Sequence, residues 1–345
     1  MNENSSRNIS MGTHWVGADV AKSTFDAALV RCNQHYPDTP LREIPACTFE
    51  RSSHGVQAFL SWLDAQGLED TDVRVVMEAT GNYSTELAVW MLAQRPTLRP
   101  AIANPRHTSA FIKSMGLRNK TDRLEARALG FYGVERRPLA YEAPSPEQAE
   151  LRALSRYRDS LVRQRTALKN QMKETCGSTF VQKNQAKRLR LLTRDIERVE
   201  EQMKALVAQH EDLNRDIELL MSIYGVAFIN ATTVLAELGD LRRFTLARQL
   251  SAFAGMSPRH RQSGTSIRGR SRLCKQGNSR VRQCLFLSAL AAIRGNNQLR
   301  DTYQRLLAQG KPRMVALGAI MRKLLTLMRA ILISGKRYQP LGITR

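Results

Sequence analysis

Four carboxylate residues stand where strands and a helix can bring them together. Asp122 and Glu125 are three residues apart on a predicted helix, so both side chains leave one face within reach of a single ion. Asp19 interrupts one apolar run, and Glu78 ends a strand-like run. Carboxylates from two strand ends and a helix form a hard-cation site suited to Mg²⁺ and phosphate chemistry. The alternative is that Asp122 and Glu125 are only solvated helix charges.

A polar, glycine-bearing segment over residues 257–278 carries six basic residues and no acid. A hydroxyl among guanidinium groups suits phosphoryl transfer by a serine nucleophile, because the arginines neutralise and orient the phosphate. Ser263 is followed by a glycine that lets a substrate come close. The other serines of this region are Ser257, Ser266, Ser271 and Ser279. From these residues alone, a loop that only grips phosphates is the favoured interpretation.

The charge of the chain is concentrated in its last third. The chain carries +22 in all, and residues 241–345 hold 22 Lys and Arg against one acid, Asp301. The first 240 residues are nearly neutral, with 31 basic and 30 acidic residues. This asymmetry predicts a polyanion-binding module, with nucleic acid as the first candidate. A membrane surface is the alternative, but no lipidation signal supports it.

Length and an apolar content of 42% predict two or three domains with sizeable cores. The five cysteines are odd in number and not closely paired, which indicates neither a disulfide framework nor a zinc site and fits a reducing cytoplasm. Residues 1–13 are polar, without a signal-peptide pattern, and are expected to be disordered. The longest apolar stretch, 314–333, is interrupted by three basic residues and predicts an amphipathic helix rather than a membrane span.

An α/β domain is expected over residues 14–144. Strand-like runs at 15–18, 25–30, 73–77 and 100–103 alternate with helical patterns at about 55–66 and 84–94. Asp19 and Glu78 then fall at carboxyl ends of strands, where open α/β sheets place their active sites.

A central helical coiled-coil hairpin is expected over residues 145–215, with a break near Gly177. Its second half repeats seam residues three and four apart over four heptads. These are Leu189, Leu192, Ile196, Val199, Met203, Leu206, His210 and Leu213. Residues 216–345 are predicted to be mostly helical around the basic loop, with amphipathic helices at about 279–294 and 313–333. The turn 223–226 weakly suggests a helical hairpin that contacts a phosphate backbone through its glycine.

Six segments together resemble the DEDD-type transposases of bacterial insertion sequences, the "one-ten" family. Members of this family are recombinases guided by an element-encoded bridge RNA, and their relatives include site-specific DNA invertases. The segments keep the family's order and extend over about residues 14–335. They are 16–22 (VGADVAK), 78–83 (EATGNY), 116–122 (GLRNKTD), 252–259 (AFAGMSPR), 263–269 (SGTSIRG) and 275–278 (KQGN).

The resemblance implies a RuvC-like (RNase H-like) N-terminal domain, a helical insertion and a C-terminal transposase domain with a serine nucleophile. The family's nucleophile falls on Ser263. Its four metal-binding acids, which would hold Mg²⁺ or Mn²⁺, fall on Asp19, Glu78, Asp122 and Glu125. Two positions depart from the family's pattern. Glu125 stands where Asp is usual, and Tyr224 stands where proline is common.

These observations predict a recombinase that moves its own insertion sequence through a phosphoserine link, which conserves the phosphodiester energy. The expected partners are donor and target double-stranded DNA, a bridge-type guide RNA, and further copies of the chain in dimers and tetramers. The expected location is the bacterial cytoplasm, at the nucleoid. Residues expected to bind nucleic acid are Lys22, Arg118, Asn119, Lys120, Arg259, Arg261, Arg268, Arg270, Arg272 and Lys275. Three rival hypotheses remain: a DNA invertase of the same family, a metal-dependent junction nuclease with an idle serine, and a non-catalytic nucleic-acid-binding protein.

Overall fold

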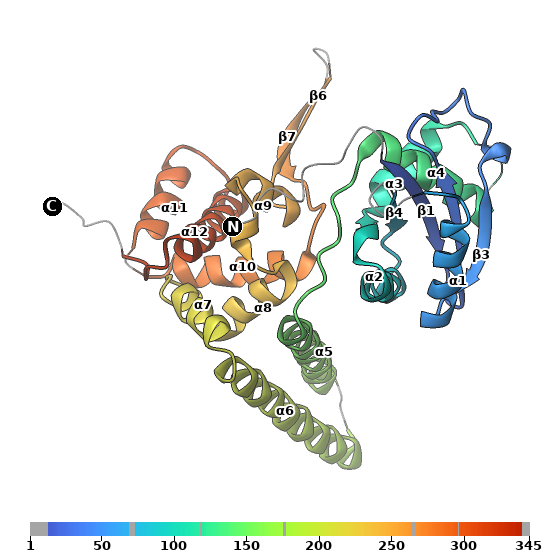
Figure 1. The fold of residues 1–345 in the computed structure, drawn as a ribbon. Helices are drawn as coiled ribbons and strands as arrows, with labels where there is room; N and C mark the ends of the chain where they lie inside the picture. The colour runs from blue at the N-terminus through green and yellow to red at the C-terminus, as the bar shows by residue number, and fades with distance from the viewer. Residues whose placement is uncertain are drawn as a thin grey trace. The chain divides into compact units, whose positions relative to one another are not determined.

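The computed structural model describes residues 13–68, 73–117, 119, 121–174, 177–263, 267–295 and 297–339, and the side chains of 259–272 are not among the described parts. The chain divides into two compact units, residues 1–143 and 144–345 (Figure 1). The predicted disordered segment 1–13 lies outside the described residues except for Thr13, which is buried.

The first unit is built on a five-stranded mixed sheet with the order β3-β2-β1-β4-β5 (Figure 1). The strands are β1 (His14–Val20), β2 (Thr24–Val30), β3 (Ala46–Glu50), β4 (Val73–Glu78) and β5 (Ala101–Ala103). Strand β2 pairs antiparallel with both β1 and β3, whereas β4 pairs parallel with β1 and β5. The four predicted strands are confirmed, and β3 was not predicted.

Helices cover both faces of this sheet. They are α1 (Ser53–Asp64), α2 (Asn82–Gln94), α3 (Pro105–Ser114) and α4 (Asp122–Arg136). Successive strand residues point to opposite faces. Accordingly Phe25 joins a core cluster with residues of α1 and α2, and Trp15 joins another with residues of α3 and α4.

Three glycines let α4 lie directly on the sheet. A Cβ added at Gly17 of β1 would come within 2.0 Å of the Ala126 carbonyl oxygen and 2.2 Å of the Gly130 amide nitrogen. On the helix side, a Cβ at Gly130 would meet Val30, and one at Gly133 would meet the Trp15 ring at 2.7 Å. Glycine is therefore required for this backbone-to-backbone approach, which fixes the first turn of α4 at the end of β1.

The second unit is mostly helical. Its elements are α5 (Pro146–Glu174), α6 (Thr179–Ala208), α7 (Glu211–Met221), α8 (Phe228–Leu238), α9 (Ala247–Phe253), β6 (Pro258–Ser263), β7 (Ile267–Leu273), α10 (Ser279–Ala292), α11 (Gln298–Ala308) and α12 (Arg313–Ser334). The expected helical insertion 145–215 belongs to this unit. None of the helices in the described ranges combines the length and apolar character needed to cross a bilayer.

The basic segment 257–278 is not the loop that its composition predicted. Strands β6 and β7 form an antiparallel hairpin with Ser263 opposite Ile267 and an irregular register between Arg259 and Arg261. Figure 1 shows the hairpin extending away from the helices of its own unit. Arginine, serine and glycine obscure the alternation of apolar residues that marks a strand, and main-chain pairing forms the ladder regardless.

The apolar residues of the heptad repeat in α6 pack against α5 of the same chain. Leu192, Ile196 and Met203 of α6 are buried in one cluster with residues of α5 such as Leu161. The predicted continuation of the repeat through His210 is wrong, because α6 ends at Ala208 and His210 is the N-cap residue of α7. The predicted break near Gly177 is confirmed by the end of α5 at Glu174 and the Ser178 cap of α6. Supercoiling of the two helices stays a prediction.

Replacing Gly17 by alanine should destabilise the first unit by at least about 3 kcal/mol, at the upper end of the usual cost of overpacking, because backbone atoms cannot move aside. The matched control is Gly318→Ala in α12, where a Cβ would meet Leu273 at an ordinary 3.7 Å and alanine favours the helix. Urea unfolding of both variants measures the difference. Equal stability of Gly17→Ala and the wild type would show that α4 can shift freely on β1.

Candidate catalytic site and nucleic-acid interface

The four predicted acids gather at one edge of the sheet. Asp19 is the penultimate residue of β1 and Glu78 the last residue of β4, and these parallel strands are neighbours with Ala18 opposite Met77. Asp122 is the first residue of α4, and Glu125 follows one turn later. The contact of α4 with β1 therefore brings the helix acids to the strand acids.

The pKa of Asp19 reflects its burial and the nearby negative charges. The pKa of Asp19 is raised to about 6, first by burial and then by the negative charges of Glu125, Asp122, Asp26 and Glu78. Each of the predicted acids thus disfavours ionisation of Asp19. In an ordinary setting an aspartate at neutral pH is ionised without such a penalty.

The acids suit a hard divalent cation by their chemistry. Carboxylate oxygens are the ligands that Mg²⁺ prefers, and a cation would relieve the mutual repulsion seen at Asp19. As the side chains stand, no three His, Cys, Asp or Glu groups of the described chain are close enough to hold one ion. Cation binding would therefore require these side chains to draw closer.

Asp26 is a fifth acid at this edge that sequence reasoning missed. It lies opposite Asp19 in the β1–β2 register and accepts a hydrogen bond from the Thr48 hydroxyl at 2.6 Å. The Arg123 guanidinium lies 3.7 Å from its carboxylate. An aspartate inside the apolar run of β2 was the signal that could have revealed it. These two partners give Asp26 a fixed position beside Asp19.

The neighbouring Glu78 is also held in place. The buried Thr108 hydroxyl of α3 donates to its Oε2 atom at 2.5 Å, and the same hydroxyl contacts the Pro105 carbonyl oxygen at 3.1 Å. Helix α3 begins with the Asn104 side chain accepting from the Arg106 amide. Because α3 was not predicted, this support for Glu78 was not either.

The predicted nucleic-acid residues are distributed over both units. Lys22 and Asn119 of the first unit are exposed, as is Lys275, which adopts a left-handed backbone with φ 57°. Arg118 and Lys120 lie outside the described residues. The hairpin arginines are placed by their backbone alone, namely Arg259, Arg261, Arg268, Arg270 and Arg272. Ser263 is the last residue of β6, beside a hairpin tip that is outside the described residues.

The base of the hairpin is tightly closed. The Cys274 amide donates to the Ser257 carbonyl at 2.8 Å, and the Lys275 amide to the Gly255 carbonyl at 3.2 Å. A Cβ at Gly277 would come within 2.4 Å of the Gly255 nitrogen, so only glycine allows these two backbones to meet. The strand that carries Ser263 therefore starts from a fixed point.

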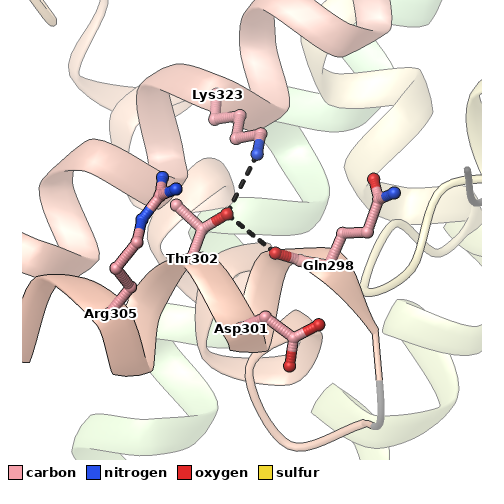
Figure 2. Close-up of a pocket in the computed structure, with 5 residues that line it drawn as sticks. All are labelled: Gln298, Asp301, Thr302, Arg305 and Lys323. Atoms are coloured by element: carbon pink, nitrogen blue, oxygen red, sulfur yellow. Dashed lines mark hydrogen bonds between the residues drawn. The ribbon is translucent and has the colours of Figure 1, made fainter. Parts of the chain in front are cut away.

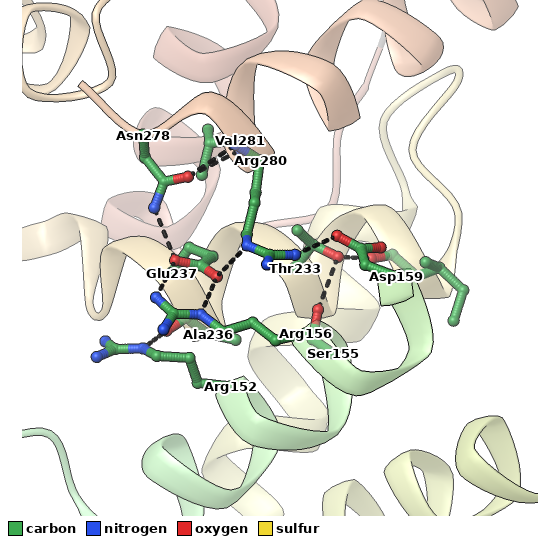
Figure 3. A network of polar contacts seen from close by, with 11 residues as sticks. Arg152, Ser155, Arg156, Asp159, Thr233, Ala236, Glu237, Asn278, Arg280 and Val281 are labelled. Carbon is green, nitrogen blue, oxygen red and sulfur yellow. Dashed lines mark hydrogen bonds and ion pairs between the residues drawn. The ribbon is translucent and has the colours of Figure 1, made fainter. Parts of the chain in front are cut away.

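A buried carboxylate ties this base to the helices of the second unit (Figure 3). Glu237 of α8 has a side chain only 1% exposed and receives two hydrogen bonds from Arg156 of α5, at 2.8 and 3.0 Å. Asn278 donates to the same carboxylate at 2.7 Å and caps α10 by accepting from the Arg280 and Val281 amides. Burial alone would raise the pKa of Glu237, but the hydrogen bonds from Arg156 and Asn278 outweigh it and hold that pKa below its ordinary value.

Close packing against α10 requires a glycine in the turn 223–226. Gly225 has φ +85°, and a Cβ there would lie 2.3 Å from the Ser288 carbonyl oxygen of α10. The adjacent Tyr224 is exposed and packs edge-on against Tyr338 with ring centroids 6.0 Å apart. A phosphate contact through this turn stays a prediction.

A shallow polar cavity of about 350 Å³ lies between α11 and α12 (Figure 2). Its lining residues are Gln298, Asp301, Thr302, Arg305 and Lys323. The Lys323 ammonium donates to the Thr302 hydroxyl at 3.0 Å, and that hydroxyl donates to the Gln298 carbonyl at 2.8 Å. No predicted site residue lines this cavity. The candidate residues lie instead at an open sheet edge and on an extended hairpin, settings that a long polymer can reach.

Comparisons with known proteins agree on one family. Residues 16–181 match the sequence model of DEDD-type IS110 transposases, and residues 217–304 match the transposase IS116/IS110/IS902 family. The pilin gene-inverting protein of Moraxella bovis is 29% identical over 95% of this chain and 98% of its own length. The transposase for insertion sequence element IS1111A of Coxiella burnetii is 31% identical over 64% of this chain and 66% of its own.

Asp19→Asn should stabilise the metal-free protein at neutral pH. A carboxyl whose pKa is raised from 3.8 to about 6 in the folded state favours folding below about pH 4 and loses that contribution as the pH rises through 6. The variant should therefore melt above the wild type near pH 7 in EDTA, and the gain should vanish near pH 4.

Asp64→Asn is the control of opposite sign, because a hydrogen bond from Arg95 lowers the pKa of Asp64. Thermal melts of the three proteins across this pH range provide the measurement. A melting temperature of Asp19→Asn at or below that of the wild type at neutral pH would contradict a strained carboxylate at this edge.

Proposed function

Since the chain belongs to the IS116/IS110/IS902 family of transposases and is a DNA recombination enzyme, we propose that it transposes an insertion sequence by way of a phosphoserine intermediate. The observation that carries the proposal is the convergence of Asp19, Glu78, Asp122 and Glu125 at one sheet edge. Burial and the negative charges around Asp19 disfavour its ionised form, and a carboxyl perturbed in this way by named neighbours is a candidate functional group. The first unit is then a RuvC-like nuclease domain.

Ser263 is the proposed nucleophile. Its oxygen bonds to a DNA phosphorus while the bond from that phosphorus to a deoxyribose oxygen breaks, and the proton lost by the serine balances the one gained by the leaving deoxyribose hydroxyl. Attack by a DNA hydroxyl on the same phosphorus then restores the serine and joins the strands, so that no external energy source is required. The arginines of β6 and β7 support this role, since guanidinium groups stabilise the charge that develops on the phosphate.

Asp19, Glu78, Asp122 and Glu125 would hold Mg²⁺ or Mn²⁺. When bound there, the ion supplies positive charge beside the phosphate and stabilises the transition state. Thr108 positions Glu78 through its hydrogen bond, and Thr48 positions Asp26 in the same way. The protein thus holds one of the four proposed ligands, Glu78, and the neighbouring Asp26 in place before any ligand binds. Glu125 reaches the same region through a side chain one methylene longer than the usual aspartate.

The basic third, residues 241–345, is the proposed main binding surface for nucleic acid. Residues 241–345 carry 22 basic residues against one acid, enough for many phosphate contacts with donor DNA, target DNA and a bridge-type guide RNA. Base pairing with such an RNA would supply sequence specificity that a protein rich in phosphate contacts does not provide by itself. Dimers that pair into a tetramer would assemble the strands to be exchanged.

Inversion of a DNA segment is the second candidate function. It is favoured by the relative named a pilin gene-inverting protein, because similarity to that protein extends over 95% of this chain. Both functions use the same cutting and joining chemistry. A plasmid in which the element's ends are placed in direct or inverted orientation distinguishes excision from inversion.

Ser263→Ala should abolish the covalent protein–DNA adduct and strand cleavage while nucleic-acid binding stays nearly unchanged. One hydroxyl adds little to binding in a segment with six basic residues. Ser271→Ala, on the paired strand of the same hairpin, is the matched control and should keep both activities. The assay traps the adduct by denaturation and detects labelled DNA on the protein. An adduct formed at the wild-type level by Ser263→Ala would overturn the nucleophile assignment.

Mn²⁺ binding, followed by electron paramagnetic resonance, should be lost in Asp122→Ala and kept in Glu125→Asp, which restores the family's usual residue. Loss of one of four carboxylates removes both charge and an oxygen ligand, whereas shortening Glu125 removes neither. Glu135→Asp at the exposed far end of α4 is the control and should bind as the wild type does. Strand cleavage should fall with Mn²⁺ binding, and full cleavage in EDTA would refute the metal role.

A further inference from the structure

An exposed aromatic ring in the first unit rests on a fixed guanidinium group. Tyr83, in the first turn of α2, is 37% exposed, and the Arg51 guanidinium carbon lies 4.5 Å from its ring centroid. The guanidinium lies over one face of the ring, and part of the residue remains exposed to solvent. A partly exposed ring that is supported from one side by a fixed group can accept a stacked base.

Arg51 is itself anchored on several sides. Its Nε atom donates to the Lys22 carbonyl at 2.8 Å, and its Nη1 atom pairs with Glu86 of α2 at 2.7 Å. Its amide donates to the Ser23 carbonyl at 2.8 Å, and its side chain is only 12% exposed. Arg51 is therefore held by three polar contacts and is largely shielded from solvent. They hold the guanidinium, and with it the ring, in one place.

The ring lies at the same edge of the sheet as the carboxylates. Tyr83 follows Glu78 by five residues, through a turn in which Gly81 adopts φ +64° and ψ −130°. Lys22, whose carbonyl accepts from Arg51, follows Asp19 by three residues, which span at most about 11 Å of extended chain. The Lys22 side chain is exposed. The ring and the ammonium group therefore both lie near the carboxyl ends of β1 and β4, within a few residues of the acids along the chain.

We propose that Tyr83 is a stacking platform for an unpaired base of the DNA strand whose phosphate lies at the carboxylates. This inference rests on the proposed function and names a contact within it. Base–aromatic stacking is tolerant of sequence, since every base has a π face, and it needs a base outside the duplex stack. Lys22 then contacts a phosphate of the same stretch. Strand exchange creates such unpaired bases beside the cut, and a base held on Tyr83 keeps the phosphate in register with the acids.

Photocrosslinking tests the platform. The full chain is irradiated in EDTA with single-stranded DNA that carries 5-iododeoxyuridine at successive positions, and crosslinked peptides are identified by mass spectrometry. We expect a crosslink at Tyr83 in the wild type, its loss in Tyr83→Ala, and an aromatic crosslink retained in Tyr83→Phe. Tyr157→Ala, at another exposed tyrosine in α5, should leave the Tyr83 crosslink unchanged. Cleavage by Tyr83→Ala should fall by roughly ten-fold or more, with recovery in Tyr83→Phe.

The outcomes separate this inference from the proposed function. A phosphoserine adduct without a Tyr83 crosslink would overturn the platform and leave the recombinase chemistry intact. A Tyr83 crosslink without an adduct at Ser263 would support the platform and refute the serine mechanism. A parallel arm uses single-stranded RNA with 5-iodouridine. A Tyr83 crosslink to RNA but not to DNA would overturn the assignment of the base to the DNA strand.

Discussion

The close approach of α4 to β1 is the contact on which the candidate catalytic site depends. Gly17 removes the side chain that would hold the two backbones apart, and Gly130 and Gly133 do the same on the helix. The acids of α4 reach Asp19 only because of this contact. Its electrostatic consequence is the raised pKa of Asp19, to about 6. Packing of small residues thus enforces an arrangement of charges that electrostatics alone would disperse.

The buried Glu237 and the half-buried Asp19 illustrate the difference between a carboxylate with hydrogen-bonding partners and one among like charges. Glu237 has two hydrogen bonds from Arg156 and one from Asn278, and its pKa is lowered despite burial. Asp19 is surrounded by other acids, and its pKa is raised. The first arrangement stabilises the fold by joining α5, α8 and the base of the hairpin. The second favours a proton or a cation in place of a bare negative charge, which is what a site for phosphate chemistry requires.

Local patterns were sufficient to predict much of the fold and the positions of four acids. Apolar runs predicted the strands whose carboxyl ends carry Asp19 and Glu78, and three-residue spacing predicted that Asp122 and Glu125 share a helix face. Contacts between residues far apart in the sequence could not be predicted from these patterns. Thr108 reaches Glu78 only once α3 is packed in place, and Asp26 lies opposite Asp19 only in the β1–β2 pairing. The β6–β7 hairpin was missed because its strands are held by main-chain pairing, with side chains that resemble those of a loop.

The basic residues are concentrated in the last third of the chain, whereas the acids of the candidate catalytic site lie in the first unit. A cluster of carboxylates repels the phosphate on which it is to act, and the first 240 residues as a whole are close to neutral. In the proposed function, affinity for nucleic acid comes from the basic third, where many phosphate contacts would outweigh the local repulsion. The proposed stacking on Tyr83 suits this arrangement, because stacking holds a base beside the acids without placing a further negative charge there. On this proposal, mutations in the basic third would weaken binding and mutations of the acids would reduce cleavage, whereas in a simple basic DNA-binding protein the acids would be dispensable.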